Sequence, residues 1–163
     1  MTVAIVLGVL LAVARAAREP LDDPDPAWQR PGFLDAGDLP VPAPPVAPGI
    51  PGRARPTVVF FERTERLSEL CRALVQNPLQ REATAVVVNV NGREAPSCVG
   101  AAGIVSDPDG ALAAAYGMRT PRGGGPPVGY TVVDGAGTIR YRTLDPVMAE
   151  QLSEVKTIVD ALP

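Results

Sequence analysis

The stretch from residue 105 to residue 145 constrains the fold most strongly, because it encodes three local structures in a fixed order. Asp107, which is followed by a proline, is typical of a helix start, and the apolar residues after it predict a helix that ends at Gly117. A loop rich in glycine and proline comes next. Residues 130–133 and 138–141 are rich in β-branched and aromatic side chains, and the Asp-Gly-Ala-Gly between them predicts a β-hairpin.

The residues before this stretch predict alternating strands and helices. Residues 57–61 and 84–90 are nearly continuous apolar runs, as expected for strands that are buried on both faces of a sheet. Between them, a helix that ends at Asn77 is predicted from helical spacing on one apolar face, formed by Leu67, Leu70, Cys71, Leu74 and Val75. A short edge strand over 103–105 and a final helix over 145–162 complete the order. Strands separated by helices pair in parallel, so we predict an α/β protein with a central mixed β-sheet flanked by helices.

The first 55 residues differ in character from the rest of the chain. Residues 1–18 contain an uncharged apolar run followed by arginines, which we interpret as an N-terminal hydrophobic helix that acts as a membrane anchor or a signal-like segment. Residues 19–55 are rich in proline, which favours extended chain and predicts a linker. The folded domain is therefore predicted to span residues 56–163.

Composition excludes several classes of function. The net charge is −3 and no basic run is present, so nucleic acid is not an expected partner. The chain has no histidine, and two cysteines alone do not form a zinc site, so we expect neither a metal nor a cofactor. The mixed charges after the first strand are interpreted as a solvated rim, formed by Glu62, Arg63, Glu65 and Arg66.

The order of elements from residue 105 onward, together with Ser68-Glu-Leu-Cys71-Arg in the first helix, resembles the thioredoxin-like redoxins. That group includes the peroxiredoxins of the alkyl hydroperoxide reductase type and the envelope-anchored thioredoxin-like proteins. The resemblance runs from Arg55 to Leu162 and implies a thioredoxin-like fold with a thiol site where the first central strand meets its helix. Against the thioredoxin Cys-x-x-Cys, Ser68 takes the place of the attacking cysteine and Cys71 that of the resolving one. Against the peroxiredoxin Thr-x-x-Cys, Ser68 matches the threonine and Cys71 the peroxidatic cysteine.

The chain departs from these patterns in ways that leave its chemistry open. Thr64 stands where the peroxiredoxin motif has proline, and Val128 stands where the resemblance places either the peroxide-polarising arginine or the thioredoxin cis-proline. Pro127 is one residue away, and a cis peptide bond before it or before Pro126 is an open alternative. The resemblance assigns four residues to substrate binding, namely Phe61, Thr64, Pro127 and Val128.

The position of the helix start decides how Cys71 behaves. If Thr64 caps the helix, Cys71 lies nearly two turns inside it and packs as an inert apolar side chain. If Ser68 caps the helix, Cys71 occupies the third helical position, where the peptide dipoles favour a thiolate.

Cys98 lies in the loop after the second buried strand. A disulfide with Cys71 would close a loop of about 26 residues and contribute about 3–4 kcal/mol. Such a disulfide fits an oxidising exterior, whereas two free thiols fit the cytoplasm. If the disulfide cycles, Cys71 is the catalytic thiol and Cys98 resolves it. A disulfide that is only structural, or absent, is the alternative.

Two functions follow from the resemblance. The first is a membrane-tethered redoxin with thiol-disulfide oxidoreductase or peroxide-reducing (antioxidant) activity, which receives electrons from a partner thiol protein. The second is a non-catalytic thioredoxin-like module that binds a partner protein over residues 61–68 and 126–129. The arginines after the apolar run would place the domain in the cytoplasm, whereas the resemblance favours a cell-membrane protein whose domain is extracytoplasmic.

Overall fold

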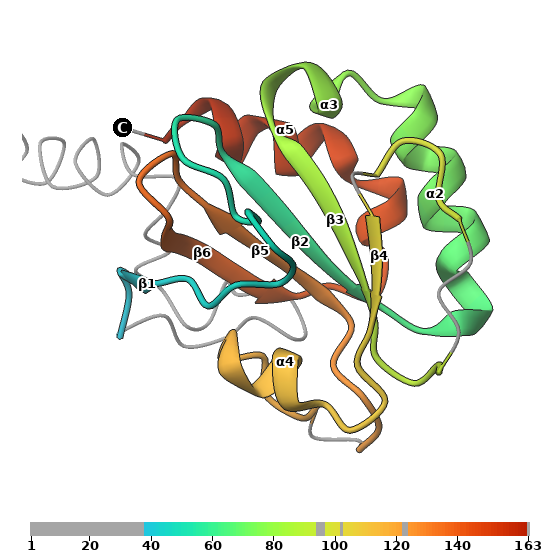
Figure 1. Cartoon of the computed structure of the whole chain (residues 1–163). Helices are drawn as coiled ribbons and strands as arrows, with labels where there is room; N and C mark the ends of the chain where they lie inside the picture. Colours follow the sequence, from blue (N-terminus) through green and yellow to red (C-terminus); the bar gives the residue numbers. More distant parts are fainter. Residues whose placement is uncertain (1–37, 94–96, 102, 122–123, 163) are drawn as a thin grey trace, which may run out of the picture.

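The computed structural model describes residues 38–93, 97–101, 103–121 and 124–162 (Figure 1). The chain forms a six-stranded sheet with helices on both faces. Its elements, in chain order, are β1 (Val41–Pro42), β2 (Thr57–Glu62), the 3-10 helix η1 (Thr64–Arg66), α2 (Leu67–Gln76), α3 (Leu79–Glu82), β3 (Thr84–Asn89), β4 (Gly103–Ser106), α4 (Ala111–Ala115), β5 (Gly129–Val133), β6 (Thr138–Leu144), the 3-10 helix η2 (Met148–Glu150) and α5 (Leu152–Asp160).

The strand order is β1-β6-β5-β2-β3-β4. β2 pairs in parallel with β3, and β3 pairs in parallel with β4. β5 is antiparallel to β2, and β6 and β1 extend that antiparallel edge. The parallel strands are those separated by long connections, and the hairpin supplies the antiparallel ones, so the predicted α/β class and mixed sheet are confirmed.

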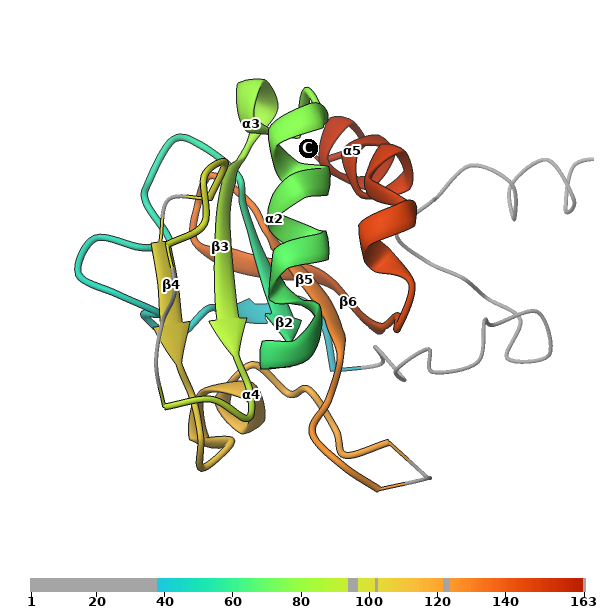
Figure 2. The same ribbon diagram turned by 90° about the vertical axis from the view of Figure 1, so that its right-hand side faces the viewer.

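The two faces of the sheet bury two separate apolar clusters. α2, α3 and α5 cover one face, whereas α4 and residues 39–50 cover the other (Figure 2). Side chains alternate along β2, as a strand requires. Val58 and Phe60 pack under α2 and α5, and Val59 and Phe61 pack under α4.

Part of the segment predicted to be a linker is folded onto the sheet. β1 pairs with β6, and five side chains of this segment pack on the same apolar cluster as α4, with Val46 buried among them: Leu39, Val41, Ala43, Ala47 and Ile50. Asp38, at the start of the described chain, forms an ion pair with the buried Arg142. Proline disfavours regular ladders but allows an edge strand of this kind, so residues 38–55 belong to the domain rather than leading to it.

The predicted hydrophobic helix at residues 1–18 and the first half of the predicted linker lie outside the described residues. Among residues 38–162, as far as the structure describes them, no helix is both long enough and apolar enough to cross a membrane.

The helix after residue 105 is held by a side chain several residues before it. Gly110 takes the N-cap position of α4 with φ of 70°, and the buried Asp107 carboxylate accepts hydrogen bonds from the N–H groups of Leu112 (3.0 Å) and Ala113 (2.8 Å). The Asp107 carboxylate thus satisfies N–H groups at the start of α4, but the prediction that the helix begins at the Asp-Pro pair is wrong. Gly110 is the N-cap residue, because residues 107–110 first form a turn.

Candidate functional site

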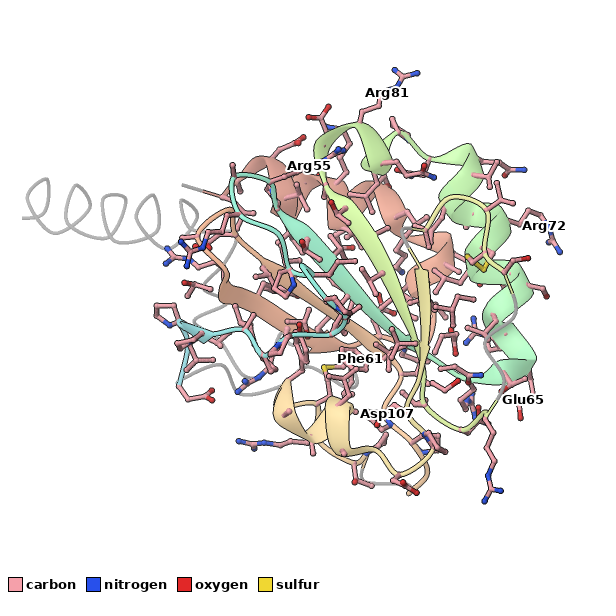
Figure 3. All side chains as sticks on the ribbon, viewed as in Figure 1. Arg55, Phe61, Glu65, Arg72, Arg81 and Asp107 are labelled. Carbon is pink, nitrogen blue, oxygen red and sulfur yellow. A yellow bond between two sulfur atoms is a disulfide. The ribbon has the colours of Figure 1, made fainter. Side chains whose placement is uncertain are left out.

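Cys71 and Cys98 form a disulfide that joins α2 to the loop between β3 and β4. Their Cα atoms are 5.3 Å apart, and both residues are partly exposed. Figure 3 shows the bond between α2 and the loop that leads to β4, while Arg72 projects outward from the same helix. The structure therefore brings together the two residues that the sequence singled out as candidates for covalent chemistry, in their oxidised form.

A tight turn positions Cys98 against α2. The N–H of Ala101 donates to the carbonyl oxygen of Cys98 (3.2 Å), and Gly100 within the turn has φ of 99°, a conformation that favours glycine. A Cβ atom on Gly100 would lie only 3.1 Å from the backbone N of Val75. The turn therefore lies against the second half of α2, and a side chain at position 100 would also meet Gln80 Nε2 at 2.7 Å.

The start of α2 differs from both sequence alternatives. The α-helix begins at Leu67, and Arg66 takes the N-cap position without a side-chain hydrogen bond. Thr64 begins the short 3-10 helix instead, and Ser68 is the exposed second residue of α2. Cys71 is thus the fifth helical residue. The helix dipole weakens beyond the first turn, so it offers Cys71 less support for a thiolate than a cap at Ser68 would have given.

The apolar face of α2 is narrower than predicted. Leu67, Leu70 and Leu74 are buried in the core, as expected from their spacing. Cys71 is only partly buried, and Val75 is 54% exposed. These two residues lie at the edge of the buried stripe, where the Cys98 turn is joined to α2 by the disulfide.

Thr64 is part of a polar network that fixes the β2–α2 connection. Its hydroxyl donates to Asn89 Oδ1 (3.0 Å), and its N–H donates to Asn91 Oδ1 (2.8 Å). Asn91 Nδ2 in turn donates to the Glu65 carboxylate. Hydrogen bonds from the backbone of Glu65 and from Asn91 lower the pKa of the Glu65 carboxyl. A Cβ on Gly92 would come closer than 3.0 Å to Asn89 and Thr64, so this network needs glycine at position 92.

Glu62 is buried, contrary to the solvated rim that the charge pattern predicted. Its side chain is 0% exposed, and Oε1 accepts the N–H of Arg63 (2.8 Å). Oε2 is buried and has no hydrogen-bond partner among the described residues. Burial raises the pKa of the Glu62 carboxyl, against the smaller opposing effects of the Arg63 hydrogen bond and the Arg66 charge. The reason for its burial is register: Glu62 continues β2 opposite Asn89 of β3, beneath the start of α2.

The other residues assigned to substrate binding lie at the opposite side of the sheet or within it. Phe61 is 0% exposed and its ring packs on Tyr116, 5.7 Å between centroids, on the α4 face. Phe61 pairs with Gly129, so the two predicted loops do adjoin. Val128 is buried, and its carbonyl oxygen accepts the N–H of Asp145 (2.9 Å).

The cis peptide bonds in the described part of the chain precede Pro40 and Pro51. The alternative of a cis peptide bond before Pro126 or Pro127 is therefore wrong.

A cavity of about 460 Å³ opens where β3 and β4 end, on the α4 side. Its lining comes from the end of β3, the start of α4 and the loop before β5, and includes Val90, Asn91, Ala113, Met118 and Pro127. Asn91 connects this cavity to Thr64 by the hydrogen bond described above. Thr64 and Ser68 remain exposed at the start of α2, and their roles in substrate binding and catalysis remain predictions.

Nothing in the described part of the chain gathers the side chains of a metal site, since no group of three or more histidine, cysteine, aspartate or glutamate residues is placed to bind an ion there. The Cys71–Cys98 disulfide has redox chemistry of its own.

Comparison with known proteins defines the fold. No family model matches the sequence, and a search of curated proteins found no match. Among solved structures, the chain is similar to bacterioferritin comigratory protein from Xanthomonas campestris, with a TM-score of 0.50 and 17% identity over 80% of this chain and 95% of that chain. AhpC from Mycobacterium tuberculosis gives a TM-score of 0.48 and 17% identity over 78% of this chain and 80% of that chain. A secreted M. tuberculosis disulfide oxidoreductase gives a TM-score of 0.43 and 19% identity over 70% of this chain and 87% of that chain.

The first of these similarities places the protein among mixed α/β folds built on a central sheet with helices on both faces. That fold is thioredoxin-like, as the resemblance predicted.

Proposed function

We propose that this protein is a thiol-disulfide oxidoreductase in which Cys71 and Cys98 alternate between a disulfide and two thiols. The observation that carries the proposal is the disulfide between α2 and the Cys98 turn on a thioredoxin-like fold, with both cysteines partly exposed. A disulfide sealed in the core could not meet another protein's sulfur, whereas this one lies at the edge of the buried stripe of α2.

The proposed cycle uses two successive exchanges. With the pair reduced, the Cys71 thiolate attacks a substrate disulfide, forms a mixed disulfide and releases one substrate thiolate. The Cys98 thiolate then attacks the Cys71 sulfur, which releases the second substrate thiol and restores the Cys71–Cys98 disulfide. Two electrons pass to the substrate, and an external protein dithiol returns two electrons and two protons to the pair.

Peroxide reduction is a second candidate, and it would use the same pair. The Cys71 thiolate would attack the peroxide O–O bond, release an alcohol or water and become a sulfenic acid. The Cys98 thiol would condense with that sulfenic acid and release water, again leaving the disulfide. The X. campestris bacterioferritin comigratory protein has an alkyl peroxide reduction activity, and the 5.3 Å separation of the two Cα atoms here suits the condensation step.

One experiment tests both forms of the proposal. The protein is reduced with dithiothreitol and freed of reductant, then mixed in separate assays with insulin and with an alkyl hydroperoxide. We expect one equivalent of substrate to be reduced per protein, with the Cys71–Cys98 disulfide restored, and no turnover for Cys71→Ser. A Ser97→Ala variant next to Cys98 serves as the matched control and should behave as wild type. If the reduced protein consumes neither substrate, the proposal fails.

A non-catalytic binding module is the less favoured alternative. Its expected groove includes Phe61 and Val128, and both are buried in the structure. A hollow does exist beside Pro127, but it lies on the α4 side of the sheet, whereas the disulfide lies on α2.

We further propose that residues 1–18 tether the domain to the cell membrane with the domain on the extracytoplasmic side. The apolar run in the sequence and the disulfide support this location, because disulfides persist in oxidising compartments. Membrane fractionation of the full chain and of a variant lacking residues 1–18 tests the proposal. The full chain should sediment with membranes and be accessible to external protease, and the shortened chain should not sediment. Recovery of the full chain in the soluble fraction would contradict it.

A further inference from the structure

Large apolar side chains that are exposed are concentrated beside the disulfide. Within the described residues they are Val75 (54% exposed), Val99 (76%) and Val147 (39%). Val99 directly follows Cys98, and Val75 is four residues after Cys71 on α2. Residues four apart lie on the same face of a helix, so Val75 and Cys71 are neighbours on the helix surface.

The two valines lie on segments that pack side by side. The Cys98 turn touches α2 at Gly100, since a Cβ there would lie 3.1 Å from the Val75 backbone N. The disulfide itself connects the same two segments one turn earlier on the helix. We call the surface made by Cys71, Arg72, Val75, Cys98 and Val99 the disulfide patch.

A positive charge borders the disulfide patch. Arg72 follows Cys71 and points away from the sheet into solvent (Figure 3). The structure records no ion pair for Arg72 within its described residues. Glu69 on the same helix is paired with Arg66 (3.4 Å), so its charge is directed to the start of α2. The patch thus combines two aliphatic side chains and a cation around a reducible bond.

We propose that the disulfide patch is the docking surface for the protein thiol that reduces Cys71–Cys98, and that this partner carries an aliphatic side chain and a carboxylate next to its reactive cysteine. The inference rests on the proposed function and specifies its electron donor. Exposed valines gain by burial against an aliphatic residue, and Arg72 attracts the carboxylate while it also favours a thiolate nearby.

The reaction at the patch balances as an ordinary exchange. The partner thiolate attacks Cys98 Sγ, the Cys71–Cys98 bond breaks, and the electron pair leaves on Cys71 beside Arg72. The second thiolate of the partner then attacks the partner's sulfur in the mixed disulfide and releases Cys98 as a thiolate. Both cysteines become thiols, and the partner becomes a disulfide.

Synthetic peptide thiols test the docking chemistry directly. Three peptides are compared that differ only around the cysteine, namely Leu-Cys-Glu, Ser-Cys-Glu and Leu-Cys-Lys. Their rates of attack on the oxidised full chain are divided by their rates with the neutral 2-hydroxyethyl disulfide, which removes differences in intrinsic thiol reactivity. We expect the Leu-Cys-Glu peptide to be about fivefold faster than either of the others.

Variants of the patch show where any preference arises. Val75→Ser with Val99→Ser should abolish the preference for leucine, and Arg72→Gln should abolish the preference for glutamate. Val147→Ser, which changes an exposed valine before η2, should keep both. The rate with dithiothreitol should be unchanged in Val147→Ser and in the double valine variant, because this small dithiol does not need the valines. In Arg72→Gln the dithiothreitol rate should fall by the same factor as the Leu-Cys-Lys rate, because the leaving Cys71 thiolate loses its neighbouring positive charge.

The outcomes separate this inference from the proposed function. Equal normalised rates for the three peptides, or preferences that persist in the patch variants, would overturn the docking surface even if the reduced protein reduces insulin. Peptide preferences as expected, with no transfer of electrons to insulin or peroxide, would support the docking surface and refute the proposed function. A disulfide that dithiothreitol fails to open would refute both.

Discussion

Opening the Cys71–Cys98 disulfide should weaken the fold by an amount that follows from its position in the chain. The two cysteines are 27 residues apart in sequence. Closing a loop of that length removes conformational freedom from the unfolded chain, which corresponds to about 3.5 kcal/mol in the chain-entropy model. We expect urea denaturation, followed by circular dichroism, to give a free energy of unfolding lower by that amount for the reduced protein. The melting temperature should fall by about 10–20 °C.

The double variant Cys71→Ala with Cys98→Ala is the control for this experiment. It should unfold close to the reduced wild type and be insensitive to reductant. Equal stability of the oxidised and reduced wild type would show that the cross-link does not hold α2 and the Cys98 turn together in the native protein. A reduced protein that is unfolded at 25 °C would contradict the proposed cycle, which needs a folded dithiol form.

Three further predictions concern residues around the site. Burial raises the pKa of the Glu62 carboxyl in the folded protein. The stabilisation from the protonated side chain is therefore complete below its pKa in the unfolded chain, and it is lost as the pH rises through its pKa in the folded protein. Urea titrations should therefore show Glu62→Gln to be more stable than wild type at pH 8, with the difference shrinking toward pH 4. Thermal melts should show Gly92→Ala destabilised by about 1–3 kcal/mol through overpacking, while Gly103→Ala, where a Cβ meets nothing within 4 Å, should be nearly neutral. Asp107→Ala should cost about 1–2 kcal/mol through loss of the α4 cap, and the exposed Asp109→Ala much less.

Most of the sheet could be predicted because its signals are local. Valine-rich runs marked β2 and β3, and the Asp134-to-Gly137 turn marked the β5–β6 hairpin, where Asp134 Oδ1 accepts the N–H groups of Ala136 and Thr138 (2.9 Å each). β1 could not be predicted, since its two residues lie in a proline-rich segment without periodicity. Its place depends on pairing with β6, which is nearly 100 residues away in the chain.

The candidate site was less predictable because it depends on how segments meet. The sequence singled out Cys71 and Cys98, but that the two residues meet depends on how the Cys98 turn packs beside α2. The burial of Glu62 follows from its register opposite Asn89, which the charge pattern around it concealed. Val75 was expected on the buried face of α2, and its exposure emerges only when the width of the core against that helix is known.

The reduction potential of Cys71–Cys98 tests the central claim most directly. It is measured by equilibrating the protein in dithiothreitol buffers of defined ratio and counting alkylated thiols by mass spectrometry. A disulfide that exchanges with other proteins should have a potential above about −300 mV, within the range of known thiol oxidoreductases. A value well below about −300 mV would identify a structural cross-link and contradict the proposed redox function.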